Sequence, residues 1–132
     1  MTTARTMKAA REAIDSLADY VGTGTARRPR RRAPRLEEIA TLVNEHFPKG
    51  YSAEVTRSWS STDRKITGTR LRYPGKGRRG NRLVVKRGTD VVVDHDSSET
   101  YRENGEALEK VARLAKHPDA HEFARRWAWW YR

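Results

Sequence analysis

The sequence predicts an α+β protein: an N-terminal helix and a basic linker, then a helix, a four-stranded antiparallel meander, and two C-terminal helices packed on one face of the sheet. Three observations predict this fold. Apolar residues recur at helical spacing near both ends of the chain, and between residues 51 and 95 they alternate with a period of two. The connections between the alternating runs are short, which favours antiparallel neighbours.

Four stretches carry apolar residues at three- and four-residue steps: 3–21, 34–47, 97–116 and 119–132. Gly22 follows the first stretch, Pro48 the second, and Pro118 the third, as expected where helices end. The apolar stripe of the first helix is narrow. It predicts docking either on the chain's own domain or on a second copy or another protein.

Four runs are expected to be strands: 51–59, 66–73, 82–87 and 90–95. Residues 60–63 form a predicted turn, and the Gly-rich residues 74–81 form the tip of a predicted hairpin. Strand side chains alternate between faces, so if Leu83 and Val85 face a core, Arg82 and Lys86 lie on the opposite face.

At 132 residues, the chain is long enough for one domain with extensions. The expected division is an amphipathic helix (1–21), an Arg-rich linker or arm (22–35) and a globular α-β-β-β-β-α-α domain (36–132). The linker contains six Arg and no Val, Leu, Ile or aromatic residue, so it cannot pack a core.

Composition excludes several classes of function. There is no Cys, and therefore no disulfide framework, Cys-based zinc site or thiol chemistry. No apolar run approaches the length of about 20 residues that a membrane helix needs, and the N-terminus lacks the apolar core of a signal peptide. We expect a cytoplasmic or nucleoid-associated protein that is not secreted by a signal peptide, has no membrane partner and needs no cofactor.

The positive charge of the chain is concentrated. The net charge is +11, and residues 64–88 contain ten Lys and Arg without one acidic residue. The linker is the second basic segment, whereas the remainder of the chain is acidic on balance. Arg outnumbers Lys by 21 to 7, which suits contacts with phosphates and also fits a GC-rich genome.

These features favour a non-enzymatic protein that binds DNA or RNA through a basic β-hairpin and an Arg-rich arm. The expected phosphate contacts come from two groups of cations, one in the arm and one in the hairpin. They are Arg27, Arg28, Arg30, Arg31, Arg32, Arg35, Arg70, Arg72, Lys76, Arg78, Arg79, Arg82 and Lys86.

The tripeptide Asp94-His95-Asp96 is the strongest hint of an enzyme or a metal site. Strand alternation places His95 on the face opposite to Asp94 and Asp96, so these side chains do not converge. A turn that follows a strand explains them better, and the sequence predicts neither a catalytic residue nor a metal ligand.

The alternative function is that of a small phage-type factor that binds protein: an inhibitor, an adaptor or a particle component. It would dock, or form a homodimer, through the N-terminal helix and use the aromatic C-terminus, Trp127, Trp129, Trp130 and Tyr131. Alternatively, Phe123, Trp127 and Trp130 cover the open face of the sheet as part of the core, and Trp129 falls off that stripe. Both interpretations stay open.

Overall fold

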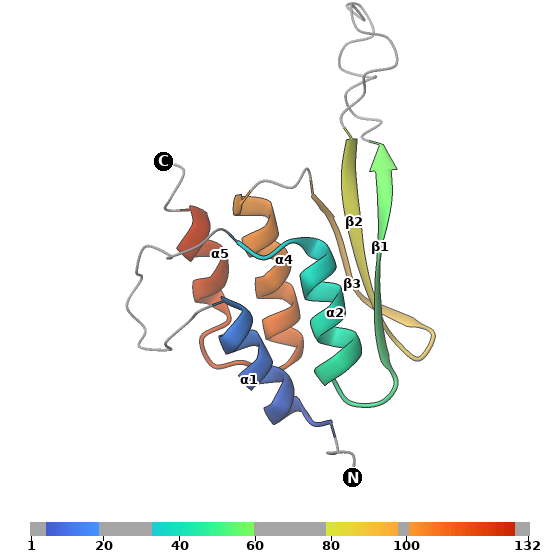
Figure 1. Cartoon of the computed structure of the whole chain (residues 1–132), viewed down its shortest axis with the longest axis vertical. Helices are drawn as coiled ribbons and strands as arrows, with labels where there is room; N and C mark the ends of the chain where they lie inside the picture. Colours follow the sequence, from blue (N-terminus) through green and yellow to red (C-terminus); the bar gives the residue numbers. More distant parts are fainter. Residues whose placement is uncertain (1–4, 19–32, 60–78, 98–100, 129–132) are drawn as a thin grey trace, which may run out of the picture.

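The computed structural model describes residues 5–18, 33–59, 79–97 and 101–128. Across these ranges the chain is an α+β protein with four helices and one three-stranded antiparallel sheet (Figure 1). The elements are α1 (Met7–Ala18), α2 (Leu36–His46), β1 (Tyr51–Trp59), β2 (Arg79–Arg87), β3 (Asp90–Ser97), α4 (Tyr101–Leu114) and α5 (His121–Ala128). The predicted α+β class is confirmed.

The central strand of the sheet is β2, with β1 on one side and β3 on the other. β1 pairs with β2 over its whole length, from Tyr51 opposite Arg87 to Trp59 opposite Arg79. The predicted four-stranded meander is wrong, because β1 occupies the side of β2 that was assigned to residues 66–73. Those residues lie outside the described ranges. The observed hairpin joins β1 to β2, and residues 60–78 connect the two strands.

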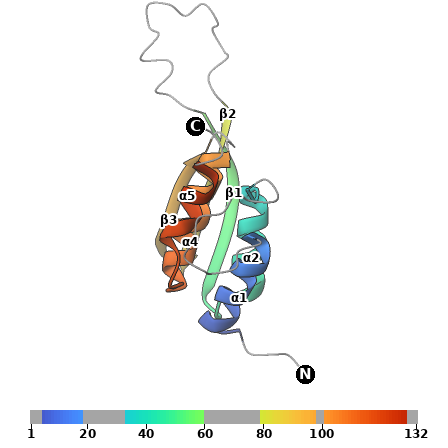
Figure 2. The ribbon, with the colours of Figure 1, turned by 90° about the vertical axis from the view of Figure 1, so that its left-hand side faces the viewer.

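The two faces of the sheet differ as alternation predicts. Leu83, Val85 and Val93 are buried on one face, whereas Arg82 and Lys86 are exposed on the other. All four helices lie on one side of the sheet, as Figures 1 and 2 show from two directions. The opposite face is free of helices from the described part of the chain.

The hydrophobic core fills the space between the helices and the inner face of the sheet. Its largest fully buried side chains come from every layer of the fold: Trp127, Phe47, Phe123, Ile14, Leu36, Ile39, Leu83 and Leu108. Complete burial of a side chain of this size contributes about 1.5–3 kcal/mol. The sheet is therefore held mainly by its helical cover, since a small isolated sheet is marginal in water.

Helix α1 docks on this core. Its Ala10, Ile14 and Ala18 are buried. Two polar contacts fix its position: the Arg11 Nη1 donates to the Ala115 carbonyl at 2.9 Å, and the Asp15 carboxylate lies 2.7 Å from Nε2 of His117. The buried face of α1 thus packs against its own domain.

Trp127 belongs to the core and not to an exposed aromatic surface. Its side chain is 1% exposed, and its ring packs on Gly105 of α4. A Cβ at position 105 would lie 3.0 Å from Cε3 of Trp127 and 3.2 Å from the Phe123 carbonyl oxygen, so glycine permits the close approach of α4 and α5. The prediction that Trp127 binds a partner is corrected by this burial. Trp129, Trp130 and Tyr131 lie outside the described residues.

A side chain of α2 fixes the edge of the sheet. The amide of Asn44 donates to the Ala53 carbonyl and accepts from the Ala53 N–H, each at 2.9 Å. The two bonds satisfy backbone groups of β1 as a neighbouring strand would. This contact ties α2 to β1 and occupies part of an otherwise open strand edge.

Successive elements alternate in direction, so their ends gather at two ends of the molecule (Figure 1). The upper end, which we call the connection end, contains the last residues of β1, β3 and α5 and the first residues of α2, β2 and α4. Helix α1 also runs upward, but it is the lowest of the helices and ends below this level (Figure 1). The lower end, the turn end, contains short turns. There the Gly88 N–H donates to the Gly50 carbonyl at 2.8 Å, and both glycines have positive φ, 64° and 104°.

None of the helices in the described ranges is long and apolar enough to cross a membrane. The longest of them, α4, has 14 residues.

Candidate nucleic-acid interface

Both basic segments of the sequence lead to the connection end: residues 60–78 are flanked there by β1 and β2, and residues 19–32 lead there to α2. Residues 19–32 join the end of α1 to the approach to α2, and residues 60–78 join β1 to β2. The first segment contains five Arg and one acidic residue, and the second contains six Lys and Arg and one acidic residue. Both segments thus join described residues at the same end of the fold.

The described residues form an almost neutral framework. They contain 16 Lys and Arg and 14 Asp and Glu, whereas the whole chain contains 28 and 17. Of the other 12 cations, 11 belong to residues 19–32 and 60–78. The excess charge of the protein is therefore a property of two connections and not of the folded layers.

Arg82 is the best-defined predicted site residue. It lies on the open face of β2, where its Nε donates to Oδ1 of Asp94 at 2.7 Å and its Nη2 donates to Oδ2 of the same carboxylate. The hydrogen bonds to Asp94 raise the pKa of Arg82, and the same bonds lower the pKa of Asp94. Arg82 is consequently engaged by an acidic neighbour on β3.

The other predicted residues within the described ranges are separated along the chain. Lys86 is exposed on the open face of β2, nearer to the turn end. Arg79 begins β2 opposite Trp59, at the point where residues 60–78 rejoin the sheet. Arg35 is exposed just before α2, where its backbone N–H donates to Oε1 of Glu38 at 2.8 Å.

The remaining predicted cations lie outside the described residues. They are Arg27, Arg28, Arg30, Arg31, Arg32, Arg70, Arg72, Lys76 and Arg78.

Two further cations on the β1–β2 ladder were not predicted as site residues. Arg57 of β1 is exposed and pairs with Asn81 near the connection end. Arg87 ends β2 with its guanidinium carbon 5.9 Å from the centre of the Tyr51 ring. Strand alternation could have indicated Arg57 as a site residue. Arg57 follows Tyr51, Ala53 and Val55 at the same two-residue spacing and lies toward the basic segment.

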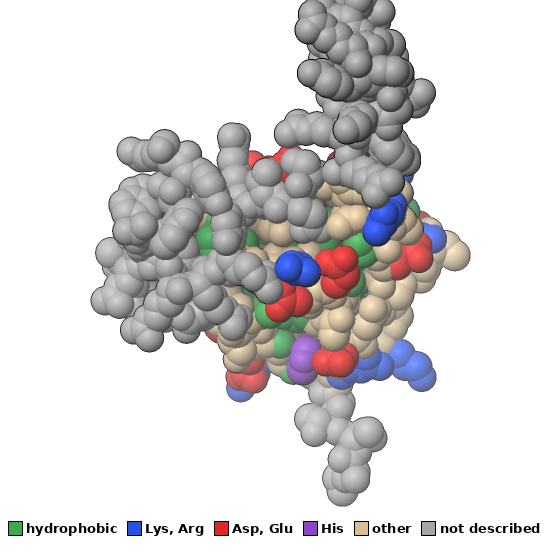
Figure 3. Space-filling view, turned by 45° about the horizontal axis from the view of Figure 1, so that its top comes forward, with side chains coloured by type: hydrophobic (Ala, Val, Ile, Leu, Met, Phe, Trp, Pro, Cys, Tyr) green, Lys and Arg blue, Asp and Glu red, His purple; other side chains and the backbone are tan. Residues whose placement is uncertain are grey.

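Acidic residues accompany the cations near the connection end. Glu37 and Glu38 lie in the first turn of α2, Glu103 lies in the first turn of α4, and Asp96 lies opposite Arg82 in the sheet. Figure 3 shows the described surface from this side, with Asp and Glu side chains interspersed among Lys and Arg. The described surface in this view presents no continuous basic patch.

The Asp94-His95-Asp96 run divides between the two faces of β3. His95 is 5% exposed on the inner face, whereas Asp94 and Asp96 are exposed on the outer face. Nζ of Lys110 lies 3.0 Å from Nδ1 of His95, and burial together with this cation lowers the pKa of His95. Among the described residues, no group of three or more His, Asp or Glu side chains is placed to hold a metal ion.

Comparisons with protein families, curated proteins and solved structures found no match to this chain.

Proposed function

We propose that this protein binds nucleic acid without catalysing a reaction, and that its basic segments contact phosphates while the α+β framework holds them at one end. The observation that carries the proposal is the separation of charge. Eleven cations belong to two connections that join described residues at the connection end, whereas the described framework is close to neutral. Clustered Lys and Arg on one side of a protein are the usual electrostatic footprint of nucleic-acid binding.

The β1–β2 ladder gives the second basic segment a fixed attachment. Trp59 and Arg79 are paired, so residues 60–78 begin and end at neighbouring positions in the sheet. Both attachment points of this segment therefore lie at the connection end. Because Arg82 is already engaged by Asp94, we place the main contacts before it, at Lys76, Arg78 and Arg79.

Contacts with phosphates predict little dependence on base sequence. The basic segments offer Arg and Lys but few of the Asn and Gln side chains that read adenine, and phosphate contacts carry no sequence information directly. We therefore expect similar affinities for duplexes of different sequence.

The decisive measurement is fluorescence anisotropy of labelled 16-base duplex DNA, duplex RNA and single strands across a salt series. Neutralising about six to ten phosphates predicts a log–log slope of about −5 to −9 for the DNA duplex. A flat response to salt, or no binding at low salt, would contradict the proposal.

A pair of charge-reversal variants separates local contacts from net charge. Arg78→Glu with Arg79→Glu alters the basic connection, whereas Lys8→Glu with Lys49→Glu makes the same change in charge at exposed positions near the turn end. The first pair should weaken binding at least about tenfold on every sequence, and the second pair much less. Equal losses would indicate attraction to overall charge alone.

A further inference from the structure

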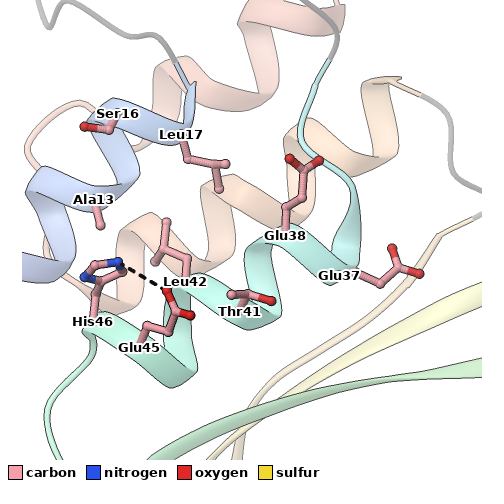
Figure 4. Close-up of a pocket in the computed structure, with 9 residues that line it drawn as sticks. All are labelled: Ala13, Ser16, Leu17, Glu37, Glu38, Thr41, Leu42, Glu45 and His46. Atoms are coloured by element: carbon pink, nitrogen blue, oxygen red, sulfur yellow. Dashed lines mark ion pairs between the residues drawn. The ribbon is translucent and has the colours of Figure 1, made fainter.

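A shallow groove with a volume of about 580 Å³ runs between α1 and α2 (Figure 4). Ligand sites in proteins commonly have volumes of about 300–1,000 Å³. Nine residues line the groove: Ala13, Ser16, Leu17, Glu37, Glu38, Thr41, Leu42, Glu45 and His46.

Short side chains open this groove. Ala13 and Ser16 on α1 and Thr41 on α2 are too small to fill the space between the two helices. Leu17 and Leu42 point toward each other and form an apolar floor (Figure 4). The helices leave apolar surface accessible at Ala13 and Leu17, which are half-buried, whereas Leu42 is 5% exposed.

The polar part of the lining is acidic. Among the described residues, the charged and titratable side chains of the lining are three Glu and one His, without Lys or Arg, and Ser16 and Thr41 are its neutral polar residues. In Figure 4, Glu38 and Glu45 lie on either side of the apolar floor, while Glu37 points away from it. Glu45 is paired with His46 at 3.8 Å, which is a long distance for an ion pair. Seven residues separate Glu38 from Glu45, which corresponds to about 10 Å along a helix.

We propose that this groove binds a short basic peptide segment of another protein, with one apolar side chain between two cationic ones. The apolar side chain would contact Leu17 and Leu42. The cations would approach the carboxylate of Glu45 and that of Glu38, whose Oε1 also accepts from the Arg35 N–H at 2.8 Å. In an extended peptide, residues i and i+4 lie on the same side about 13 Å apart. Arg side chains are flexible enough to bridge the difference between this separation and the spacing of the two carboxylates. The proposal goes beyond nucleic-acid binding and does not rest on it.

The net charge of the protein makes such binding informative. With a formal charge of +11, the whole molecule repels a cationic peptide at long range. Attraction must then come from the local carboxylates and the apolar floor, so a positive result cannot be ascribed to general electrostatics.

The experiment uses the full chain, labelled with ¹⁵N, and two acetylated and amidated peptides, Arg-Ala-Leu-Ala-Arg and Arg-Ala-Ser-Ala-Arg. The first peptide should produce saturable NMR shifts in the amides of Leu17, Thr41 and Leu42. The second should bind about tenfold more weakly, because it lacks the apolar side chain. Equal binding of the two peptides, or shifts confined to other elements, would overturn the proposal.

Three variants locate the site. Glu45→Gln removes one exposed carboxylate from the groove, and Ala13→Leu narrows its opening. Glu54→Gln removes an exposed carboxylate from β1 as the matched control. The first two should each weaken binding of the Leu peptide several-fold, and the third should leave it unchanged. If Glu45→Gln and Ala13→Leu both bind the Leu peptide with the affinity of the unaltered chain, the proposal fails.

A fourth variant tests whether the occupant is the chain's own arm. Arg27, Arg28, Arg30, Arg31 and Arg32 are replaced by Ser. If the unaltered chain and this variant bind the Leu peptide with equal or modestly different affinities, the result supports an external partner. Binding only after the replacement would overturn that choice in favour of the arm. A loss of nucleic-acid affinity in the same variant is measured separately and bears on the proposed function alone.

Discussion

The connection end and the turn end of this molecule use their residues differently. The turn end is closed by short turns, and the Gly88 N–H bonds to the Gly50 carbonyl across two of them. The connection end instead leads into residues 19–32 and 60–78, which contain 11 of the 28 Lys and Arg. The core of the described elements and most of the net positive charge thus belong to separate parts of the chain, so each can be altered while the other is measured.

The largest expected effect comes from breaking the framework at Trp127. Trp127→Ala removes a fully buried indole and should lower the free energy of unfolding by about 3–5 kcal/mol. Urea denaturation monitored by circular dichroism measures this loss. The charge of both basic segments stays unchanged, so retained nucleic-acid binding at temperatures where the variant is unfolded would show that the framework is dispensable for it.

A smaller effect is expected where α4 meets α5. Gly105→Ala ordinarily favours a helix, but here the added Cβ would meet the Trp127 ring at 3.0 Å and the Phe123 carbonyl at 3.2 Å. We expect a net loss of about 1–3 kcal/mol in the free energy of unfolding. In a Trp127→Leu background the loss should shrink, because one of the two obstructions is gone. The same loss in both backgrounds would contradict the contact.

Lowering the pH tests the framework separately from the Arg residues of the basic segments. It changes the charge of titratable groups in the framework, whereas every Arg stays charged. Burial and Lys110 lower the pKa of His95 below its ordinary value of 6.5, so the unfolded chain binds this proton more readily than the folded chain. Stability from the neutral His95 is present above pH 6.5 and is lost as the pH falls below it. Urea midpoints between pH 8 and 5 should therefore fall, and less steeply in His95→Gln. Parallel profiles would contradict this assignment.

The smallest effect is expected from the Arg82–Asp94 pair, which lies on the exposed face of the sheet. Exposed ion pairs contribute little to stability and are screened by salt. A double-mutant cycle with Arg82→Gln and Asp94→Asn should give a small coupling that decreases in 1 M NaCl. Asp94→Asn alone frees Arg82, so it should slightly strengthen nucleic-acid binding. Weaker binding would place Asp94 itself in the interface.

Local patterns in the sequence predicted most of the elements. Helical spacing located the four helices of the described ranges, with ends marked by Pro48 and Pro118, and the alternation of Leu83 and Val85 gave the buried face of β2. The choice of strand partner was wrong. Residues 51–59 and 79–87 pair across 19 intervening residues. A local alternation of side chains does not indicate which distant strand will pair with it. The prediction therefore placed the nearer run with the same pattern, residues 66–73, beside residues 82–87.

The candidate site was predicted less completely than the fold. Clustering of Lys and Arg is visible in the sequence, but the pairing of Arg82 with Asp94 depends on the register between β2 and β3. The groove between α1 and α2 was also beyond sequence reasoning, because it arises from where Ala13, Ser16 and Thr41 meet in space. The Asn44 contact with Ala53 depends likewise on a helix meeting a strand edge.

The pairing of Trp59 with Arg79 has a consequence for how this protein can vary. The two ends of the 60–78 segment lie side by side on adjacent strands, and lengthening such a connection has only a small entropic cost. We therefore expect that the length of this segment can change without altering the register between β1 and β2. Homologues with this architecture would then differ most in the length and charge of that segment, and the core around Phe47 and Trp127 would change least.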